Sequence, residues 1–311
     1  MTVPDYQTLI DAPTWAFIAQ SAVGYPADGT GLTIADQRRI YDAMCVRFHR
    51  GYPAGVTAQD SRLGGVPVRI YAGTDATVVY FHGGGFVVGG LESHDDICAE
   101  ICAATGFRVV SVDYRLVPEH PHPAAFDDAL SATRAIAKRF GGPLVLVGDS
   151  AGGNLAAAVT QAAGRSGALG IAGQVLIYPG LGGDPDRGSY LDHAAAPMLN
   201  RVDVLYYSAM RHEGAAPVRD ATSAPLQDSD FARLPPTVTF AAECDPLADD
   251  ARDYAATLIA AGSRSVCVEE RGLVHGYLRA RATVPRAAAS FGRIIDAVAA
   301  LGRGEFQRVS A

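Results

Sequence analysis

The chain has 311 residues, which is enough to bury a large core in one large domain or two ordinary ones. Apolar residues make up 49% of it and charged residues 19%, a composition typical of soluble globular proteins and unlike that of disordered chains. The net charge of −7 comes from 26 basic and 33 acidic side chains without a basic run, so a nucleic-acid partner is not expected.

The N-terminal segment Met1–Asp5 has no basic stretch followed by an apolar one, so a secretory signal is not expected. No run of about 18 uninterrupted apolar residues occurs, so no membrane span is predicted. The five cysteines are odd in number and have no regular spacing. They indicate reduced thiols and a cytoplasmic location.

The first sixty residues have a different pattern from the rest of the chain. Helix-like patterns cover residues 12–22 and 34–49, and no strand pattern separates them. The second helix is expected to start at Thr33, because Thr33 and Asp36 have the spacing of a capping box.

From Val66 onward, strand patterns and helix patterns alternate. Strands are predicted at residues 66–72, 76–82, 107–113, 143–147, 173–178, 236–242 and 265–270. Helices are predicted at residues 93–105, 122–139, 151–163, 249–262 and 284–301, the first of them capped by Ser93 with Asp96 and ended by Gly106. This alternation predicts an α/β fold with a doubly wound, mostly parallel sheet.

A glycine-rich segment, His82–Phe86, reads H-G-G-G-F and directly follows the predicted strand 76–82. Transfer of an acyl group needs fixed hydrogen-bond donors for the oxyanion of a tetrahedral intermediate, and backbone N–H groups meet this need. Glycines let the backbone approach closely and adopt positive φ. A phosphate-binding loop is the alternative, but neither G-x-G-x-x-G nor G-K-[ST] is present. The segment therefore predicts an oxyanion hole.

His94, Cys98 and Cys102 follow one another at one-turn spacing in the predicted helix 93–105. They form either a metal-binding face or a helix face with small thiols buried beside Ile97 and Ile101. The second interpretation is favoured because no fourth ligand is evident nearby. We expect no metal.

The segment Gly148–Gly152 reads G-x-S-x-G and joins the predicted strand 143–147 to the predicted helix 151–163. In a chain with 34 glycines the pentapeptide alone is a weak signal, and an incidental glycine-rich loop is the alternative. The strand before it and the helix after it strengthen the signal, because a serine on a sharp strand-to-helix turn is exposed above the sheet. Ser150 is therefore the candidate nucleophile.

The alternation of strands and helices is interrupted between Leu181 and Pro217. This stretch opens with the loop sequence Gly182–Asp186 and then has an aromatic, helix-like patch at Val202–Met210. A surface excursion that packs on its own core is one interpretation. The favoured one is a cover over the site, because the insert follows the strand after the candidate nucleophile.

A serine nucleophile needs a base, normally histidine, and an acid that orients it. His275 follows the predicted strand 265–270, and the acid is expected between serine and histidine in the chain. Asp245 lies just after the strand 236–242 and is the favoured acid, with Glu243 second. Asp249 and Asp250 are expected in the first turn of a helix.

The other histidines have a weaker case for a role as the base. Two of them flank prolines and look structural, and three lie in the helical extra segments: His120 and His122, and then His49, His193 and His212.

Together these motifs resemble the hormone-sensitive-lipase-like (HGGG-type, family IV) carboxylesterases of the α/β-hydrolase fold. The resemblance extends from about residue 66 to the C-terminus, with the motifs in the family's order. The matching segments are His82–Phe86 for HGGG, Asp113–Glu119 for D-Y-R-L-A-P-E with Val117 as a mild departure, Gly148–Gly153 for G-D-S-A-G-G, Asp245–Leu247 for D-P-L and His275–Tyr277 for H-G-[FY].

The resemblance implies a serine carboxylesterase with a Ser150, Asp245 and His275 triad. It implies oxyanion donors at the backbone N–H groups of Gly84, Gly85 and Ala151, with Gly83 as an alternative. It also implies a helical cap of residues 1–60 plus the insert 181–217, over a core of residues 61–180 and 218–311. Short-chain esters are the expected substrates, and no cofactor is expected. A homodimer is suggested by the resemblance alone.

The substrate pocket is expected to include Phe86, Asp149, Tyr206, Tyr207 and Met210. The bulky members would narrow it and favour acyl groups of roughly two to six carbons, or they simply pack the cap. The same triad would also serve an amidase, a deacetylase or a transacylase. A ligand-binding receptor on this scaffold is disfavoured, because the receptors that resemble this family lack the histidine that is present here.

Overall fold

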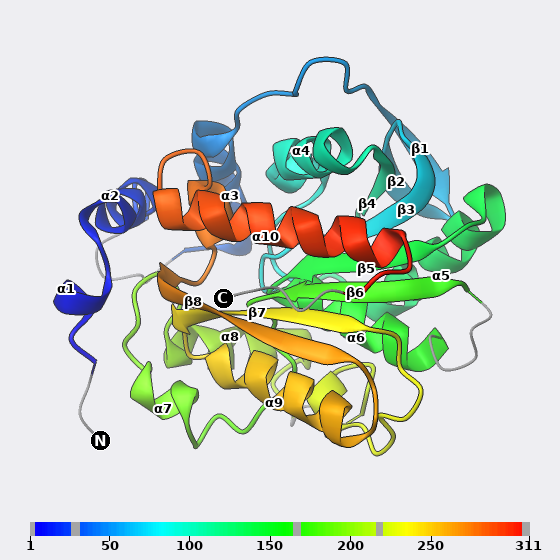
Figure 1. Cartoon of the computed structure of the whole chain (residues 1–311). Coiled ribbons are helices and arrows are strands. Elements are labelled where there is room, and N and C mark those ends of the chain that lie inside the picture. Colours follow the sequence, from blue (N-terminus) through cyan, green and yellow to red (C-terminus); the bar gives the residue numbers. More distant parts are fainter. Residues whose placement is uncertain (1–3, 26–31, 164–168, 216–219, 307–311) are drawn as a thin grey trace.

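A single eight-stranded sheet forms the centre of the computed structural model, which describes residues 4–25, 32–163, 169–215 and 220–306 (Figure 1). Its strand order is β1-β2-β4-β3-β5-β6-β7-β8. The β1–β2 and β2–β4 pairs are antiparallel and every other pair is parallel. The strands are β1 (Ala58–Leu63), β2 (Val66–Tyr71), β3 (Thr74–Phe81), β4 (Phe107–Val112), β5 (Leu144–Asp149), β6 (Ile171–Ile177), β7 (Thr237–Cys244) and β8 (Ser265–Val274).

Helices cover both faces of the sheet, which confirms the predicted doubly wound, mostly parallel α/β arrangement. On one face lie α4 and α10, and on the other α5, α6 and α9 (Figure 1). These core helices are α4 (Asp95–Thr105), α5 (Ala124–Phe140), α6 (Ala151–Ala163), α9 (Ala248–Ala260) and α10 (Pro285–Gly302). The central strands are buried on both faces, as parallel strands between two helix layers must be.

The remaining helices belong to the two segments that break the βα alternation. They are α1 (Tyr6–Leu9), α2 (Ala12–Ser21), α3 (Ile34–Phe48), α7 (Ser189–Asp192) and α8 (Arg201–Arg211). The two segments meet in space. The Tyr6 hydroxyl lies 3.1 Å from Nδ1 of His193, and the Gln37 amide donates to the Tyr206 hydroxyl at 3.0 Å. Residues 216 and 217, at the end of the expected insert, lie outside the described residues.

Several element ends differ from the sequence-based expectation. Strand β1 was not expected, and it begins at Ala58, inside the segment assigned to the cap. Strand β1 lies at the edge of the sheet and is largely exposed, and its sequence A-Q-D-S-R-L is mostly polar. The apolar pattern by which a strand is predicted is therefore missing. Strand β8 was predicted to end at residue 270, where charged residues occur, but it continues to Val274. The extension is stabilised by pairing with β7, in which Cys244 is the partner of Val274.

Three predicted helix signals can be checked directly. The Thr33 and Asp36 capping box is present, and Gly106 ends α4 in the left-handed conformation at φ 72°. The predicted Ser93 cap is wrong, because the 3-10 helix η1 (Leu91–His94) precedes α4 and its Ser93 hydroxyl donates to the carbonyl of Gly90 instead.

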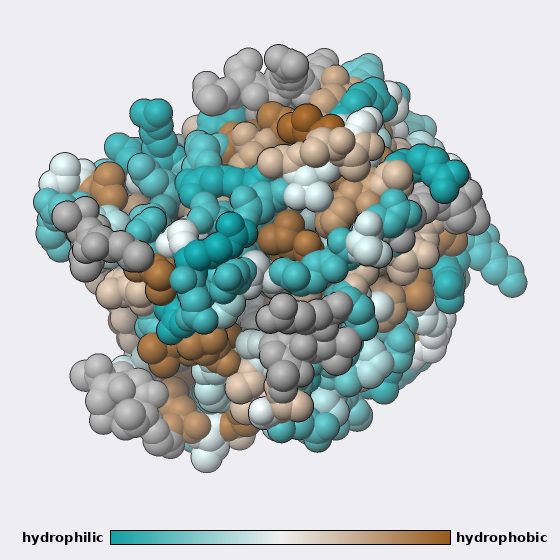
Figure 2. Space-filling model, turned by 90° about the horizontal axis from the view of Figure 1, so that it is seen from below, coloured by the Kyte–Doolittle hydropathy of each residue, from teal (hydrophilic) through white to brown (hydrophobic). Residues whose placement is uncertain are grey.

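In the part of the chain that the structure describes, no helix has the length and apolarity needed to cross a bilayer. Seen from below, hydrophobic residues gather in separate groups between hydrophilic ones (Figure 2). Some large apolar side chains of the α8 region are exposed, among them Val202, Leu205 and Met198.

The tightest backbone contact in the sheet's centre lies at the turn from β5 to α6. A Cβ atom on Gly152 would lie 1.9 Å from the carbonyl oxygen of Phe81 on β3, and one on Gly148 would lie 2.3 Å from the carbonyl carbon of Gly152. Neither position has room for a side chain. Between them, Ser150 adopts φ 54°, a left-handed conformation that is uncommon for a residue with a side chain.

A matched pair of glycine substitutions tests this packing. We expect Gly152→Ala to lower the free energy of unfolding by about 3 kcal/mol or more, because its methyl group meets a strand backbone that cannot move away. Gly292→Ala should instead stabilise the protein by about 0.5–1 kcal/mol, because Gly292 is exposed within α10 and nothing lies near its Cβ position. Urea unfolding of both variants measures the difference. Equal effects of the two substitutions would contradict the packing argument.

Candidate active site

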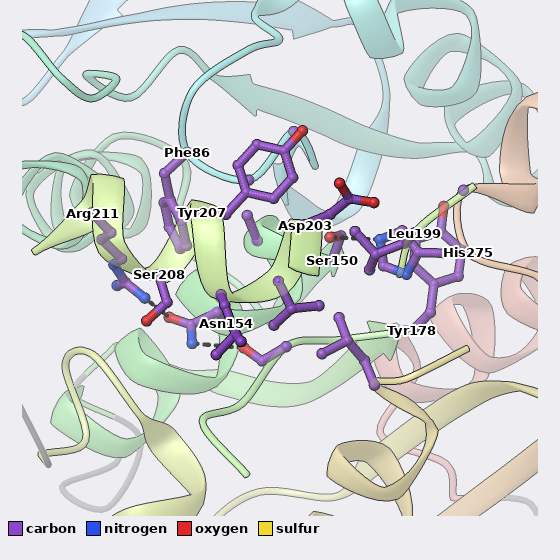
Figure 3. A pocket seen from close by; sticks show the side chains of 18 of the residues that line it. Phe86, Ser150, Asn154, Tyr178, Leu199, Asp203, Tyr207, Ser208, Arg211 and His275 are labelled. Atoms are coloured by element: carbon purple, nitrogen blue, oxygen red, sulfur yellow. Dashed lines mark hydrogen bonds between the residues drawn. The ribbon is translucent and has the colours of Figure 1, made fainter. Parts of the chain in front are cut away.

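Ser150 lies on the turn from β5 to α6, at the carboxyl end of the sheet's central parallel strands. Its own backbone N–H donates to the carbonyl of Ile177 on β6 at 2.9 Å, and this bond fixes the turn against the neighbouring strand. The left-handed backbone at this residue turns the side chain out of the strand–helix junction and into a cavity (Figure 3). The hydroxyl is therefore accessible to a bound molecule.

A chain of two hydrogen bonds runs from Ser150 to a buried carboxylate. Nε2 of His275 lies 2.9 Å from the Ser150 Oγ, and Nδ1 of His275 lies 2.7 Å from Oδ2 of Asp245. Asp245 is fully buried, and its other oxygen accepts the backbone N–H of Leu247 at 2.9 Å. A carboxylate held in this way fixes which nitrogen of the imidazole faces the serine. The structure thus brings together the three residues that the sequence singled out.

Glu243, the second candidate for the acid, is not part of this chain. Its Oε2 accepts the backbone N–H of Gly272 at 2.6 Å, so it secures strand β8. Four of the other histidines also have neighbours elsewhere. The pairs are His49 with Asp95, His122 with Thr222, His193 with Tyr6 and His212 with Ser223.

The glycine loop after β3 passes beside the Ser150 turn. Gly84 and Gly85 adopt φ 131° and 60°, which glycine tolerates best. Within the described residues, the backbone N–H groups of Gly84, Gly85 and Ala151 have no acceptor. The N–H of Gly83 donates to Oδ1 of Asp149 at 3.0 Å and is therefore unavailable to an oxyanion. The alternative assignment of Gly83 as a donor is wrong for this reason.

Asp149 lines the cavity, as expected, but the residue is only 2% exposed and its carboxylate is directed into the structure behind the glycine loop. Besides the Gly83 amide, it accepts the Tyr80 hydroxyl at 2.9 Å, and Nε2 of His94 lies 3.3 Å from its Oδ2. Burial raises the pKa of Asp149, but His94 and Arg279 outweigh it and hold the pKa below its ordinary value. Asp149 is therefore an anion that anchors the glycine loop.

His82, the first residue of the glycine motif, packs behind this loop. Its ring stacks on Tyr114 with centroids 4.3 Å apart, and the Tyr114 hydroxyl donates to the His82 carbonyl at 2.6 Å. Burial lowers the pKa of His82 to about 3, so this imidazole is neutral near pH 7. The segment Asp113–Glu119 thus supports the loop through Tyr114, a contact that the sequence alone did not suggest.

In η1 and α4, the three residues for which metal binding was the less favoured interpretation have other contacts. His94 hydrogen bonds to Asp149 and to the Ser93 hydroxyl, and Cys98 and Cys102 are buried free thiols. Among the described residues, no group of three or more histidine, cysteine or acidic side chains is placed to hold a metal ion.

The cavity above Ser150 has a volume of about 1110 Å³. Of the expected pocket residues, Phe86 and Tyr207 line it (Figure 3). Asp149 belongs to its wall as well. Tyr206 and Met210 do not occur among the lining residues in the described part of the chain, which corrects the expectation. Their side chains lie on other sides of α8, where Tyr206 is 39% exposed and Met210 packs on the core.

Several polar residues of the cavity wall were not expected from the sequence: Asn154, Tyr178, Asp203, Arg211 and Arg279. Asn154 lies four residues after Ser150, so helical periodicity could have placed it on the same side of α6. Asp203 and Arg211 lie in or beside the helix-like patch of the insert, and Arg279 lies two residues after the His275–Tyr277 motif, but no local signal distinguishes these residues or Tyr178.

Comparison with known proteins adds a family context to this geometry. A family model described as the α/β-hydrolase fold matches residues 78–279. The chain is 38% identical over 248 residues to carboxylesterase NlhH of Mycobacterium tuberculosis, covering 75% of this chain and 77% of that protein. It is 40% identical over 218 residues to esterase LipI of the same species, covering 68% of each.

Solved structures match over nearly the whole chain. The crystal structure of DphMB1 superposes with a TM-score of 0.82 at 35% identity, covering 95% of this chain and 99% of that one. An esterase of the bacterial hormone-sensitive lipase family superposes with a TM-score of 0.84 at 27% identity, covering 93% of this chain and 98% of that one.

A second buried carboxylate lies near Asp245, in the first turn of α9 as expected. Asp250 is 1% exposed, and it accepts the backbone N–H of Leu181 and the hydroxyl of Tyr190. It thereby connects the sheet domain to the start of the 181–217 insert. Burial, reinforced by the charge of Asp245, raises the pKa of Asp250 to about 7 in spite of these hydrogen bonds.

The raised pKa of Asp250 predicts how stability changes with pH. Its ordinary pKa is 3.8, so the folded state binds a proton that the unfolded state releases between about pH 4 and 7. This contribution to stability is complete below about pH 4 and is lost as the pH rises through about 7. Between about pH 5 and 8, we therefore expect the Tm of Asp250→Asn to fall less than that of the unchanged protein.

The control is Asp253→Asn on the same helix, which removes the same charge from an exposed ion pair with Arg187. Its Tm should follow the unchanged protein across the pH range. If the Tm of Asp250→Asn changes with pH as much as the Tm of the unchanged protein and of Asp253→Asn, Asp250 does not titrate in this range.

Proposed function

Because this chain belongs to the α/β-hydrolase family and is a carboxylic ester hydrolase related to the hormone-sensitive-lipase-like esterases, we propose that it cleaves esters through a triad of Ser150, His275 and Asp245. The observation that carries the proposal is the hydrogen-bonded chain from Ser150 Oγ through His275 to Asp245, with distances of 2.9 and 2.7 Å.

In the first half of the reaction, Ser150 Oγ attacks the ester carbonyl carbon while Nε2 of His275 takes up the hydroxyl proton. The imidazolium that forms is stabilised by the Asp245 carboxylate on Nδ1. The tetrahedral intermediate then collapses. His275 gives its proton to the leaving alkoxide, the ester C–O bond breaks, and an alcohol and an acyl-enzyme result.

The oxyanion of the intermediate is bound by the backbone N–H groups that have no internal acceptor, at Gly84, Gly85 and Ala151. Ala151 is the first residue of α6, so the partial positive charge at the helix N-terminus adds to its effect. Asp149 keeps these donors in place by holding the neighbouring Gly83 amide. Donors fixed before the reaction need no reorganisation when charge develops.

In the second half, a water molecule takes the place of the alcohol. His275 removes its proton, the resulting hydroxide attacks the acyl carbon, and Ser150 leaves with that proton. The balance is one ester and one water converted into one carboxylic acid and one alcohol. This chemistry uses side chains and backbone groups of the chain itself.

The cap in this proposal consists of the helices of residues 1–60 that precede β1, together with the insert 181–217. It contributes Tyr207, whose ring lies against the glycine loop so closely that a Cβ on Gly85 would lie 2.5 Å from it. A ring in this position shortens the space available next to the oxyanion hole. The proposal therefore includes a preference for short acyl groups.

Replacing the nucleophile tests the triad. We expect Ser150→Ala to lower kcat for a short-chain aryl ester by about 10⁴-fold or more, because the attacking oxygen is lost. A fluorophosphonate probe should label the unchanged protein at Ser150, as located by mass spectrometry, and should not label the variant. Ser61→Ala on β1, outside the cavity, is the control and should keep full activity. Full activity of a correctly folded Ser150→Ala variant would refute the triad.

Two neighbouring tyrosines on α8 provide a matched test of chain-length preference. Tyr207 lines the cavity and Tyr206 does not, so we expect Tyr207→Ala alone to shift the optimum of kcat/KM towards longer acyl chains. The measurement is kcat/KM for a series of esters from acetate upward. An unchanged profile for Tyr207→Ala, or the same shift for Tyr206→Ala, would contradict this explanation.

A further inference from the structure

A buried arginine without a carboxylate partner lines the cavity. Arg211, the last residue of α8, is 6% exposed. Its guanidinium donates to Oδ1 of Asn154 at 3.2 Å and to the backbone carbonyls of Ser223 at 3.0 Å and Thr222 at 3.2 Å. All three acceptors are neutral. Within the described ranges of the chain, no carboxylate lies within ion-pair distance of Arg211.

Other arginines with little exposure have an acidic group beside them. Arg279, also in the cavity wall, donates to the Tyr41 hydroxyl and lies close enough to the buried Asp149 anion to lower its pKa. Arg281 binds Asp96 and Glu100, and Arg69 binds Asp95 together with two exposed carboxylates. A buried charge is costly unless an opposite charge compensates it. Arg211 is therefore a buried cation without a carboxylate that would compensate its charge.

The groups around Arg211 leave its charge largely uncompensated. His122 and His212 lie next to it and have lowered pKa values, so they are neutral near pH 7. Asp220, whose charge acts on Arg211, is exposed, and its carboxylate accepts the backbone N–H groups of Thr222 and Ser223. Burial lowers the pKa of Arg211 to about 9, which still leaves the guanidinium protonated at neutral pH.

Part of the guanidinium remains free to bind a ligand. Of its three hydrogen bonds, two are donated by Nη1 and one by Nη2. Of the five N–H groups of the guanidinium, the Nε–H and one N–H of Nη2 therefore have no acceptor among the described residues. The guanidinium carbon lies 3.8 Å from the centroid of the Phe86 ring, which packs on one face of the planar guanidinium and limits its movement. Two N–H groups on a fixed planar guanidinium match the two oxygens of a carboxylate.

Two helices relate Arg211 to the reacting centre. Its partner Asn154 lies one turn beyond Ser150 on α6, about 6 Å along the helix. On α8, Asp203, Tyr207 and Arg211 follow at four-residue spacing along the cavity side, with Asp203 near His275 and Arg211 at the opposite end (Figure 3). His275 must face the leaving alcohol to protonate it. The acyl group therefore extends the other way, towards Phe86 and Arg211.

Accepting the proposed hydrolysis at Ser150, we propose that the preferred substrates are esters whose acyl group ends in a second, ionised carboxylate, which pairs with Arg211. These are the half-esters of short dicarboxylic acids. The bond cleaved is the ester bond at Ser150. The second carboxylate is unchanged by the reaction, and the products are the free dicarboxylate and the alcohol.

The test compares two ethyl esters of each acyl length, derived from succinate, glutarate and adipate. One has a free ω-carboxylate and the other has the neutral ω-amide of the same size. For at least one length, the unchanged protein should show a kcat/KM about 10- to 100-fold higher for the carboxylate, as expected for charge-assisted hydrogen bonds. Equal values at every length would overturn the inference.

Variants of Arg211 test whether its positive charge causes the preference for the ω-carboxylate ester. Arg211→Met should lower kcat/KM for the carboxylate to the level of the amide while leaving the amide within about threefold, and Arg211→Lys should retain part of the preference. Arg201→Met, on the same helix but paired with Asp186 outside the cavity lining, should keep the full preference. An equal loss on both esters in Arg211→Met would mean that Arg211 only holds the cap together, and would overturn the inference.

The outcomes separate this inference from the function on which it depends. If neither ester is cleaved at Ser150, the proposed function fails. If both are cleaved equally well, the proposed function stands and the inference fails. If Arg211→Met does not fold, competition in the unchanged protein decides. Glutarate should inhibit hydrolysis of a neutral ester at a concentration about tenfold lower than its neutral diamide does, and equal inhibition would overturn the inference.

Discussion

The site depends on one close contact between backbones, at the point where α6 begins beside the end of β3. The Cβ position of Gly152 lies 1.9 Å from the Phe81 carbonyl oxygen, so the helix can start there only without a side chain. Phe81 is followed directly by the glycine loop, and Gly152 lies two residues after Ser150. The same contact therefore fixes the candidate nucleophile and its candidate oxyanion donors relative to each other.

The buried carboxylate of Asp149 fixes the glycine loop from the side opposite the cavity. Asp149 precedes Ser150 and holds the Gly83 amide, while Tyr80 and His94 also bind it. These contacts replace the water that the carboxylate loses on burial. As a result the N–H of Gly83 is occupied, and the N–H groups that follow it remain free to face the cavity. Asp149 therefore supports the glycine loop, while the adjacent candidate nucleophile Ser150 faces the cavity.

The sheet domain and the cap segments contribute different properties. The candidate serine, histidine, acid and oxyanion donors all lie at the ends of parallel strands of the central sheet. Helix α8 places Tyr207 and Arg211 in the wall of the cavity, where their side chains contribute to its size and charge. In the proposed mechanism, the reacting groups therefore lie at the ends of the sheet strands, while the proposed substrate preferences depend on side chains of α8.

The sequence by itself determined the strand–helix alternation and the positions of the motifs, because apolar periodicity and glycine requirements are local properties of the chain. It did not reveal β1, whose polar residues join the sheet through pairing with β2. It also could not show that Gly83 is occupied by Asp149 or that Tyr207 faces the cavity while Tyr206 does not. Only the tertiary structure decided these points, because the direction of a side chain and the partner of an N–H depend on elements that are distant in sequence.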